Sequence, residues 1–131
     1  MSENRVTVYE LIGGEETFER LVQSFYAKVE ADEELRAIFP EDLEPGKVHQ
    51  KFFLMQYWGG PAIYSEERGH PRLRMRHNPF AITPHLRNRW VEHMLAAIDD
   101  VGIEEPSRSL MREYFERAAS VMVNRYQPPS E

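Results

Sequence analysis

The stretch GHPRLRMRHNPF, residues 69–80, places two histidines and three arginines directly before a helix-breaking proline. Within it, LRMRH can form only about one helical turn, because Pro79 ends the helix and restricts the residue before it. The preceding residues, 62–72, are predicted to be mostly irregular, and a long irregular connection is usually functional. Three interpretations fit so basic a segment: a nucleic-acid patch, a metal site, or a wall of a cofactor pocket.

The overall charge argues against a general nucleic-acid role. The chain has 131 residues, with 16 Lys and Arg against 22 Asp and Glu, so its net charge is −6. Nucleic-acid-binding domains usually carry a basic face, so a chain with this net charge could bind nucleic acid only through a local basic patch. Residues 1–131 are predicted to form a single domain, with a short polar tail from about residue 127.

The compartment and the chemistry are limited by what the sequence lacks. There is no cysteine, which excludes disulfides, thiolate metal sites, iron–sulfur clusters and a cysteine nucleophile. The first residues, MSENRVTVYEL, do not have the pattern of a signal peptide, and no apolar stretch is long enough to cross a membrane. We therefore expect a cytoplasmic protein with neither a membrane nor a nucleic acid as its partner.

Helix caps, breakers and apolar spacing predict an all-α fold with about five main helices. Thr7 and Glu10 have the spacing of a capping box, and Thr83 followed by Pro84 is a typical helix start. Segment 41–46, EDLEPG, is predicted to be a loop. The helical segments are 7–14, 15–32, 32–40, 47–61, 82–102 and 106–126. Their predicted apolar stripes contain Phe18, Leu21, Val22, Phe25 and Val29; Leu86, Trp90, Met94, Ala97, Ile98 and Val101; and Leu110, Met111, Tyr114, Phe115, Ala118, Val121 and Met122.

The five histidines offer few metal-binding patterns. No two of them stand four residues apart with a glutamate between, so a non-haem metal site has little support. His49, His85 and His93 have polar or charged neighbours, and no function is assigned to them. His70 precedes a proline and is interpreted as a turn residue.

His77 has a different setting. It ends a short amphipathic turn, with Leu73 one turn earlier on the same face. The break at Asn78-Pro79 frees backbone carbonyls, and one of them can orient the imidazole by accepting its second N–H. A proximal haem ligand needs such an imidazole against an apolar wall. Arg74 and Arg76 would then match the haem propionates, although a solvent-exposed basic loop explains them equally well.

Four motifs now occur together: FYAKV, QYWGGP, YSEERGHPRLRMRHNPF and RWVEHM, in that order. With them the chain resembles the group II truncated haemoglobins, from about YELIGG to MVNRY. The resemblance implies a two-over-two α-helical globin fold with a very short first helix. It also implies a haem b cofactor, and a helix before the proximal histidine that is reduced to a loop and one turn.

The same resemblance implies roles for individual residues on the haem. His77 corresponds to the proximal ligand of the iron, and Arg76 and Tyr64 match residues that contact the propionates. Further contacts with the porphyrin are implied for Phe53, Leu73 and Phe39.

On the distal side, the family pattern assigns Tyr26, Gln50 and Trp90 to the space around the bound ligand. Their side chains all carry hydrogen-bond donors. Gly46 falls where other globins can carry a gating side chain. Many family members have tyrosine at the position of Phe39 and an apolar residue at that of Gln50, so this chain has lost a hydroxyl and gained an amide.

The resemblance implies reversible binding of O₂ at ferrous iron, with CO, nitric oxide and peroxide as further ligands. Three distal donors predict slow release, which suits bulk oxygen transport poorly. A haem redox enzyme, peroxidase-like or converting nitric oxide to nitrate, stays open as an alternative, as does a ligand sensor. Any turnover would need an external electron donor, because the sequence contains no flavin or reductase domain. A haem-free helical interaction module is a third reading, and the sequence does not decide between a monomer and a homo-oligomer.

Overall fold

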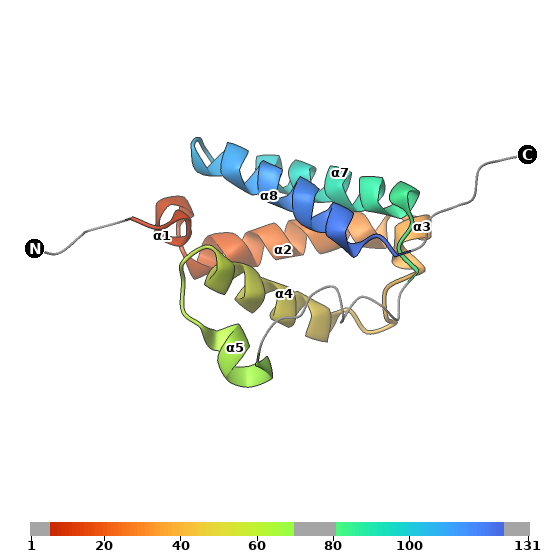
Figure 1. The fold of residues 1–131 in the computed structure, drawn as a ribbon, viewed down its shortest axis with the longest axis horizontal. Helices are drawn as coiled ribbons and strands as arrows, with labels where there is room; N and C mark the ends of the chain where they lie inside the picture. The colour runs from red at the N-terminus through yellow and green to blue at the C-terminus, as the bar shows by residue number, and fades with distance from the viewer. Residues whose placement is uncertain (1–5, 70–80, 125–131) are drawn as a thin grey trace, which may run out of the picture.

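The computed structural model describes residues 6–69 and 81–124, and in these two ranges it contains seven α-helices and no strand. The predicted all-α class is confirmed. None of these helices has both the length and the apolar character that crossing a bilayer requires. The helices are α1 (Val8–Ile12), α2 (Glu15–Glu30), α3 (Glu33–Arg36), α4 (Glu44–Tyr57), α5 (Ile63–Arg68), α7 (Pro84–Asp100) and α8 (Ser107–Met122) (Figure 1).

The short helix α1 begins and ends as its sequence predicts. The Thr7 side chain accepts a hydrogen bond from the Glu10 backbone N–H, and the Glu10 carboxylate accepts one from the Thr7 N–H. This reciprocal pair is the capping box. Gly13 ends the helix with φ of 114°, a conformation that glycine adopts without a steric cost. The turn delivers the chain directly into α2.

The core lies between α2, α4, α7 and α8. Helix α2 packs against α7 on one side and α4 on the other, and α7 also packs against α8 (Figure 1). All five residues of the predicted α2 stripe are buried, as are Met94, Ala97 and Ile98 on α7. Burial of these side chains is the main favourable contribution to folding.

Two predictions for the middle of the chain were wrong. Segment 41–46 is not all loop, because α4 begins at Glu44 and includes Gly46 in its first turn. Pro45 is compatible with this start, since the first turn of a helix does not use its backbone N–H groups. Segment 62–72 is not mostly irregular within its described part, because Ile63–Arg68 forms α5. A backbone N–H···O bond from Glu66 to Ala62 opens this helix.

The predicted apolar stripe of α8 is correct at its centre and wrong at two positions. Met111, Tyr114 and Phe115 are buried, whereas Leu110 is 50% exposed and Val121 is 56% exposed. The buried face of α8 is narrower than its apolar pattern, and among the described residues it packs against α7, α1 and the end of α4.

Candidate functional site

Tyr26 lies on the buried face of α2, with 5% of its surface exposed. Its ring makes an edge contact with Phe39 at 5.9 Å between centroids and another with Phe25 at 5.5 Å. Burial raises the pKa of Tyr26 to about 12. The phenol therefore keeps its proton throughout the physiological range and can donate a hydrogen bond.

Gly46 leaves the space that the Tyr26 hydroxyl occupies. A Cβ atom added to Gly46 would lie 2.8 Å from the Tyr26 hydroxyl oxygen, closer than a carbon can approach without a shift. No hydrogen bond joins that hydroxyl to another residue of the described ranges. Lys47, the next residue of α4, places its Nζ 5.9 Å from the Tyr26 ring centroid. The start of α4 thus packs against Tyr26 in the second half of α2.

Gln50 stands one turn after Gly46 on α4 and carries a buried polar atom. Its Oε1 has no hydrogen-bond partner within the part of the chain that the structure describes. A buried, unpaired amide end costs roughly 1–3 kcal/mol. Rotation of the side-chain amide can present either its oxygen or its NH₂ group to the same space. Such an atom needs an explanation, and a ligand supplies one.

Trp90 comes from α7 and, like Tyr26, contacts the ring of Phe25. Its ring centroid is 5.1 Å from that of Phe25 and 5.9 Å from that of Phe115. The side chain is half-buried against the core, and no hydrogen bond links its Nε1 to another described residue. Two of the predicted distal donors therefore flank a single aromatic ring.

Phe53 and Tyr64 form a second aromatic group, where α5 returns to α4. Their rings meet edge to face at 5.5 Å, and Tyr64 is buried. The guanidinium carbon of Arg68 lies 5.9 Å from the Tyr64 ring centroid. Helix α5, which the sequence did not predict, is the element that brings Tyr64 to Phe53.

The structure thus brings together some predicted site residues and leaves others apart. Tyr26, Phe39 and Gly46 are in contact, Trp90 joins them through Phe25, and Phe53 pairs with Tyr64. No described contact joins Gln50 to the other predicted residues. His77, Arg76 and Leu73 lie outside the described residues.

A family model described as bacterial-like globin matches residues 7–124. The haemoglobin of the thermophilic phototrophic bacterium Chloroflexus aurantiacus superimposes with a TM-score of 0.91 at 63% identity, over 92% of this chain and all of that one. Group 2 truncated hemoglobin YjbI of Bacillus subtilis is 46% identical over 116 residues, which is 88% of this chain and 87% of that protein. The chain belongs to the group II truncated haemoglobins.

Membership confirms the predicted two-over-two fold and implies a haem cofactor with gaseous ligands. A third relative, the truncated oxygen-avid haemoglobin from Bacillus subtilis, superimposes with a TM-score of 0.87 at 44% identity, over 91% of this chain and all of that one. The described residues fit a haem. Phe39, Phe53 and Trp90 are partly buried and offer aromatic surface, while Gln50 offers a buried oxygen atom without a partner among the described residues.

A buried polar cluster in this truncated haemoglobin was missed by sequence reasoning. Asp32, whose side chain is 3% exposed, receives hydrogen bonds from Arg89 and His93 of α7. The Arg89 guanidinium, with further hydrogen bonds from His93 and Leu35, holds the pKa of Asp32 well below its usual range. His93 was assigned no function because its sequence neighbours are polar. Only Asp32 as a helix cap was visible in the sequence, since its partners are 57 and 61 residues away.

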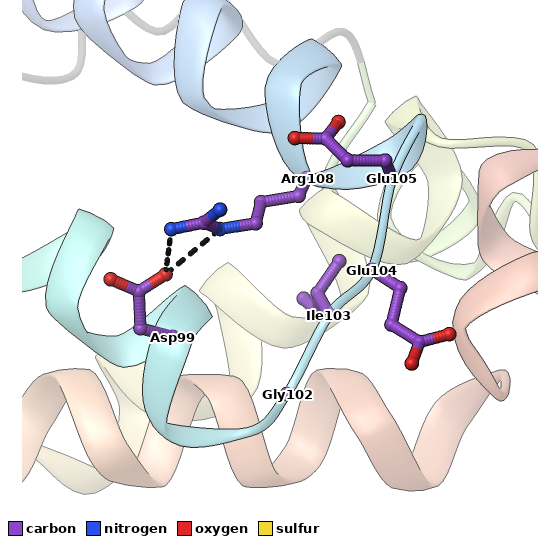
Figure 2. Close-up of a pocket in the computed structure, with 6 residues that line it drawn as sticks. All are labelled: Asp99, Gly102, Ile103, Glu104, Glu105 and Arg108. Carbon is purple, nitrogen blue, oxygen red and sulfur yellow. Dashed lines mark hydrogen bonds and ion pairs between the residues drawn. The ribbon is translucent and has the colours of Figure 1, made fainter.

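An open hollow at the connection between α7 and α8 shares no residue with this site. It is lined by Asp99, Arg108 and the turn 102–105. Figure 2 shows Arg108 reaching across to Asp99, and its Nε lies 3.0 Å from Oδ1 of that carboxylate. The cation of the hollow is therefore already paired, and the hollow is not the site predicted for the cofactor.

Proposed function

We propose that this truncated haemoglobin carries haem b and binds O₂ reversibly, holding it with hydrogen bonds from its distal side chains. Haem supplies the ferrous iron at which the diatomic ligand binds. The observation that carries the proposal is the buried Gln50 Oε1, which has no partner among the described residues. The Tyr26 hydroxyl and the Trp90 indole N–H, which also have no hydrogen bond to a described residue, support it from their contacts with Phe25.

The distal side chains would act as donors to a ligand that carries partial negative charge. Tyr26 remains protonated because its pKa is raised to about 12, and the indole of Trp90 can only donate. A hydrogen bond to a charged group contributes roughly 1.5–3 kcal/mol, which corresponds to about one to two decades in a dissociation rate. Trp90 is held by a long helix, so we propose that it dominates.

On the proximal side, we propose His77 as the sole protein ligand of the iron. Arg76 and Tyr64 would hold the propionates, and Leu73, Phe53 and Phe39 would pack against the porphyrin. The buried Tyr64 beside Phe53 supports the part of this assignment that lies on described residues. The absence of cysteine from the chain supports a cytoplasmic location as part of the same proposal.

Slow O₂ release would distinguish this protein from a bulk carrier. The haemoglobin from Bacillus subtilis, which is 44% identical to this chain, is oxygen-avid, and this supports high affinity here. A protein that holds O₂ tightly suits capture, sensing or chemistry better than delivery. We propose high affinity as the property to measure first.

A second candidate is peroxide-dependent oxidation of an external electron donor. Ring contacts run from Trp90 to Phe115, from Phe115 to Tyr114 at 5.2 Å, and from Tyr114 to Tyr57 at 4.3 Å. Tyr57 is half exposed, so this series of rings reaches the surface. One hydrogen peroxide would be reduced to two water molecules by two electrons from the donor and two protons from the donor or solvent.

One set of measurements separates the candidates. The purified protein is expected to show the Soret band of bound haem, and the ferrous form is expected to release O₂ slowly in stopped-flow mixing. Rapid turnover of peroxide with a reductant would favour the enzyme. Purified protein that neither contains nor takes up haem would contradict both and favour the helical interaction module.

A further inference from the structure

The Asp32 carboxylate joins three segments of the chain in the described structure. It lies between α2 and α3, where its Oδ1 accepts a hydrogen bond from the Leu35 backbone N–H at 3.2 Å. Its Oδ2 accepts from Arg89 Nε at 2.6 Å and is 2.8 Å from His93 Nε2. A carboxylate in its ionised form can only accept, so His93 bonds to it with Nε2 protonated.

The two oxygens therefore hold two different elements. Oδ1 caps α3, the turn whose chain continues to Phe39, and Phe39 packs on the ring of Tyr26. Oδ2 holds α7 at the residues on either side of Trp90, one position before it and three positions after it. Figure 1 shows α3 beside the first turns of α7, where this connection is made.

We propose that Asp32 is a positioning residue for ligand binding. Its carboxylate fixes the distance between the Phe39–Tyr26 pair on one side and Trp90 on the other. The inference rests on the proposed function, since it assigns Asp32 to the distal ligand site. Asp32 does not touch the ligand in this account. It acts through the segment after α3, which places Phe39 against Tyr26, and through α7, which carries Trp90.

The chemistry of the cluster suits such a role. Hydrogen bonds to an ionised carboxylate are shorter and stronger than neutral ones, and Arg89 and His93 both donate to one oxygen. Asp32 is almost fully buried, so water does not compete for its oxygens. Residues that orient others in a binding site are held by such supporting bonds, and small displacements then change the binding.

The test uses Asp32→Asn in the haem-loaded protein. The remaining amide oxygen can still cap α3, whereas the NH₂ group faces the N–H of Arg89 and weakens the connection to α7. Asp99→Asn is the matched control, because it makes the same change on an exposed side chain at the other end of α7, where Asp99 pairs with Arg108. Each protein is examined for its haem content, its melting temperature, the infrared stretching band of its CO complex, and its rate of O₂ release.

We expect Asp32→Asn to keep its haem, to shift or split the CO band, and to release O₂ at least about threefold faster at temperatures well below its melting transition. Asp99→Asn is expected to match the wild type in its CO band and in its rate of O₂ release. A lower melting temperature for Asp32→Asn, with an unchanged CO band and O₂ release, would show a merely structural role and overturn the inference. An equal effect of Asp99→Asn would overturn it too.

Three further variants apply if Asp32→Asn does not fold. His93→Ala and Arg89→Ala each remove one donor, and each is expected to shift the CO band in the same direction. His93→Gln, which keeps an N–H donor, is expected to restore part of the wild-type band. Unchanged bands in both alanine variants would overturn the inference. Wild-type protein without haem would instead contradict the proposed function, and the role of Asp32 with it.

Discussion

Two side chains with buried oxygen atoms, Asp32 and Gln50, differ in their hydrogen bonding. Asp32 has hydrogen bonds to both of its oxygens from three donors, whereas Gln50 has a buried Oε1 with no partner among the described residues. The Tyr26 hydroxyl, six residues before Asp32, likewise has none. Folding alone favours pairing every buried polar group, since an unpaired one costs roughly 1–3 kcal/mol. We infer that the paired group supports the architecture, and we propose that the unpaired groups at the predicted site bind a ligand.

The largest effect is expected from the loss of haem, the cofactor at which the unpaired groups would contact a ligand. His77→Ala is expected to abolish stable haem binding, or to leave an iron that binds only when imidazole is added, because His77 is the proposed sole protein ligand. Absorption spectra of the ferrous protein with and without imidazole measure this. A normal ferrous spectrum without imidazole would remove His77 from the account.

The paired group is expected to matter for stability, and in a pH-dependent way. Asp32→Asn should lower the free energy of unfolding at neutral pH by about 2 kcal/mol, because Arg89 and His93 lose their acceptor. The pKa of Asp32 is lowered in the folded state, so its stabilisation is present above the unfolded value of about 4 and is lost as pH falls below it. Denaturant unfolding from pH 7 to pH 2 should show a steeper acid loss for the wild type than for Asp32→Asn. Parallel curves would contradict this assignment.

Gly46→Ala is expected to displace the unpaired Tyr26 hydroxyl and to have a smaller effect than Asp32→Asn on the free energy of unfolding. The new methyl group would lie 2.8 Å from the Tyr26 hydroxyl oxygen unless that ring moved. We expect O₂ release to change by about threefold, while the free energy of unfolding changes by less than about 1 kcal/mol. Stopped-flow release and denaturant unfolding of the same sample provide both values. A large loss of stability with normal release would mean that Gly46 serves packing instead.

Gln50→Leu should have the smallest effect on stability, and this result sharpens the comparison most. Removing an unpaired buried amide removes its desolvation cost, so the free energy of unfolding of the haem-free protein should stay the same or rise by up to about 1 kcal/mol. Chemical denaturation of the apoprotein measures it. A loss as large as that of Asp32→Asn would show that the Gln50 amide has a structural partner.

Local signals made most of the fold predictable. Thr7 with Glu10, Asp32 and Thr83 with Pro84 each mark a helix start by contacts within three or four residues, and the structure confirms all of these starts. Helix α5 escaped prediction because its sequence, IYSEER, carries no apolar stripe. Its position depends on hydrogen bonds between Gln56 and Ser65.

The candidate site was predictable only through the family resemblance. Helical spacing marks Tyr26 and Trp90 as core side chains but does not show that both contact Phe25. The pairing of Asp32 with His93 joins residues 61 positions apart, and no local pattern encodes it. His93 was assigned no function because of its polar or charged sequence neighbours, whereas its Nε2 lies 2.8 Å from Oδ2 of Asp32.

The rate of O₂ release from the ferrous protein tests the central claim most directly, when wild type is compared with Trp90→Phe, Tyr26→Phe and Gln50→Leu. If the unpaired atoms hold the ligand, Trp90→Phe should speed release by at least about tenfold and by more than Gln50→Leu does. A Trp90→Phe rate within about twofold of wild type, beside a large effect of Gln50→Leu, would contradict the leading role of Trp90. Rates within about twofold of wild type in all three variants would contradict the claim that these groups are kept for the ligand.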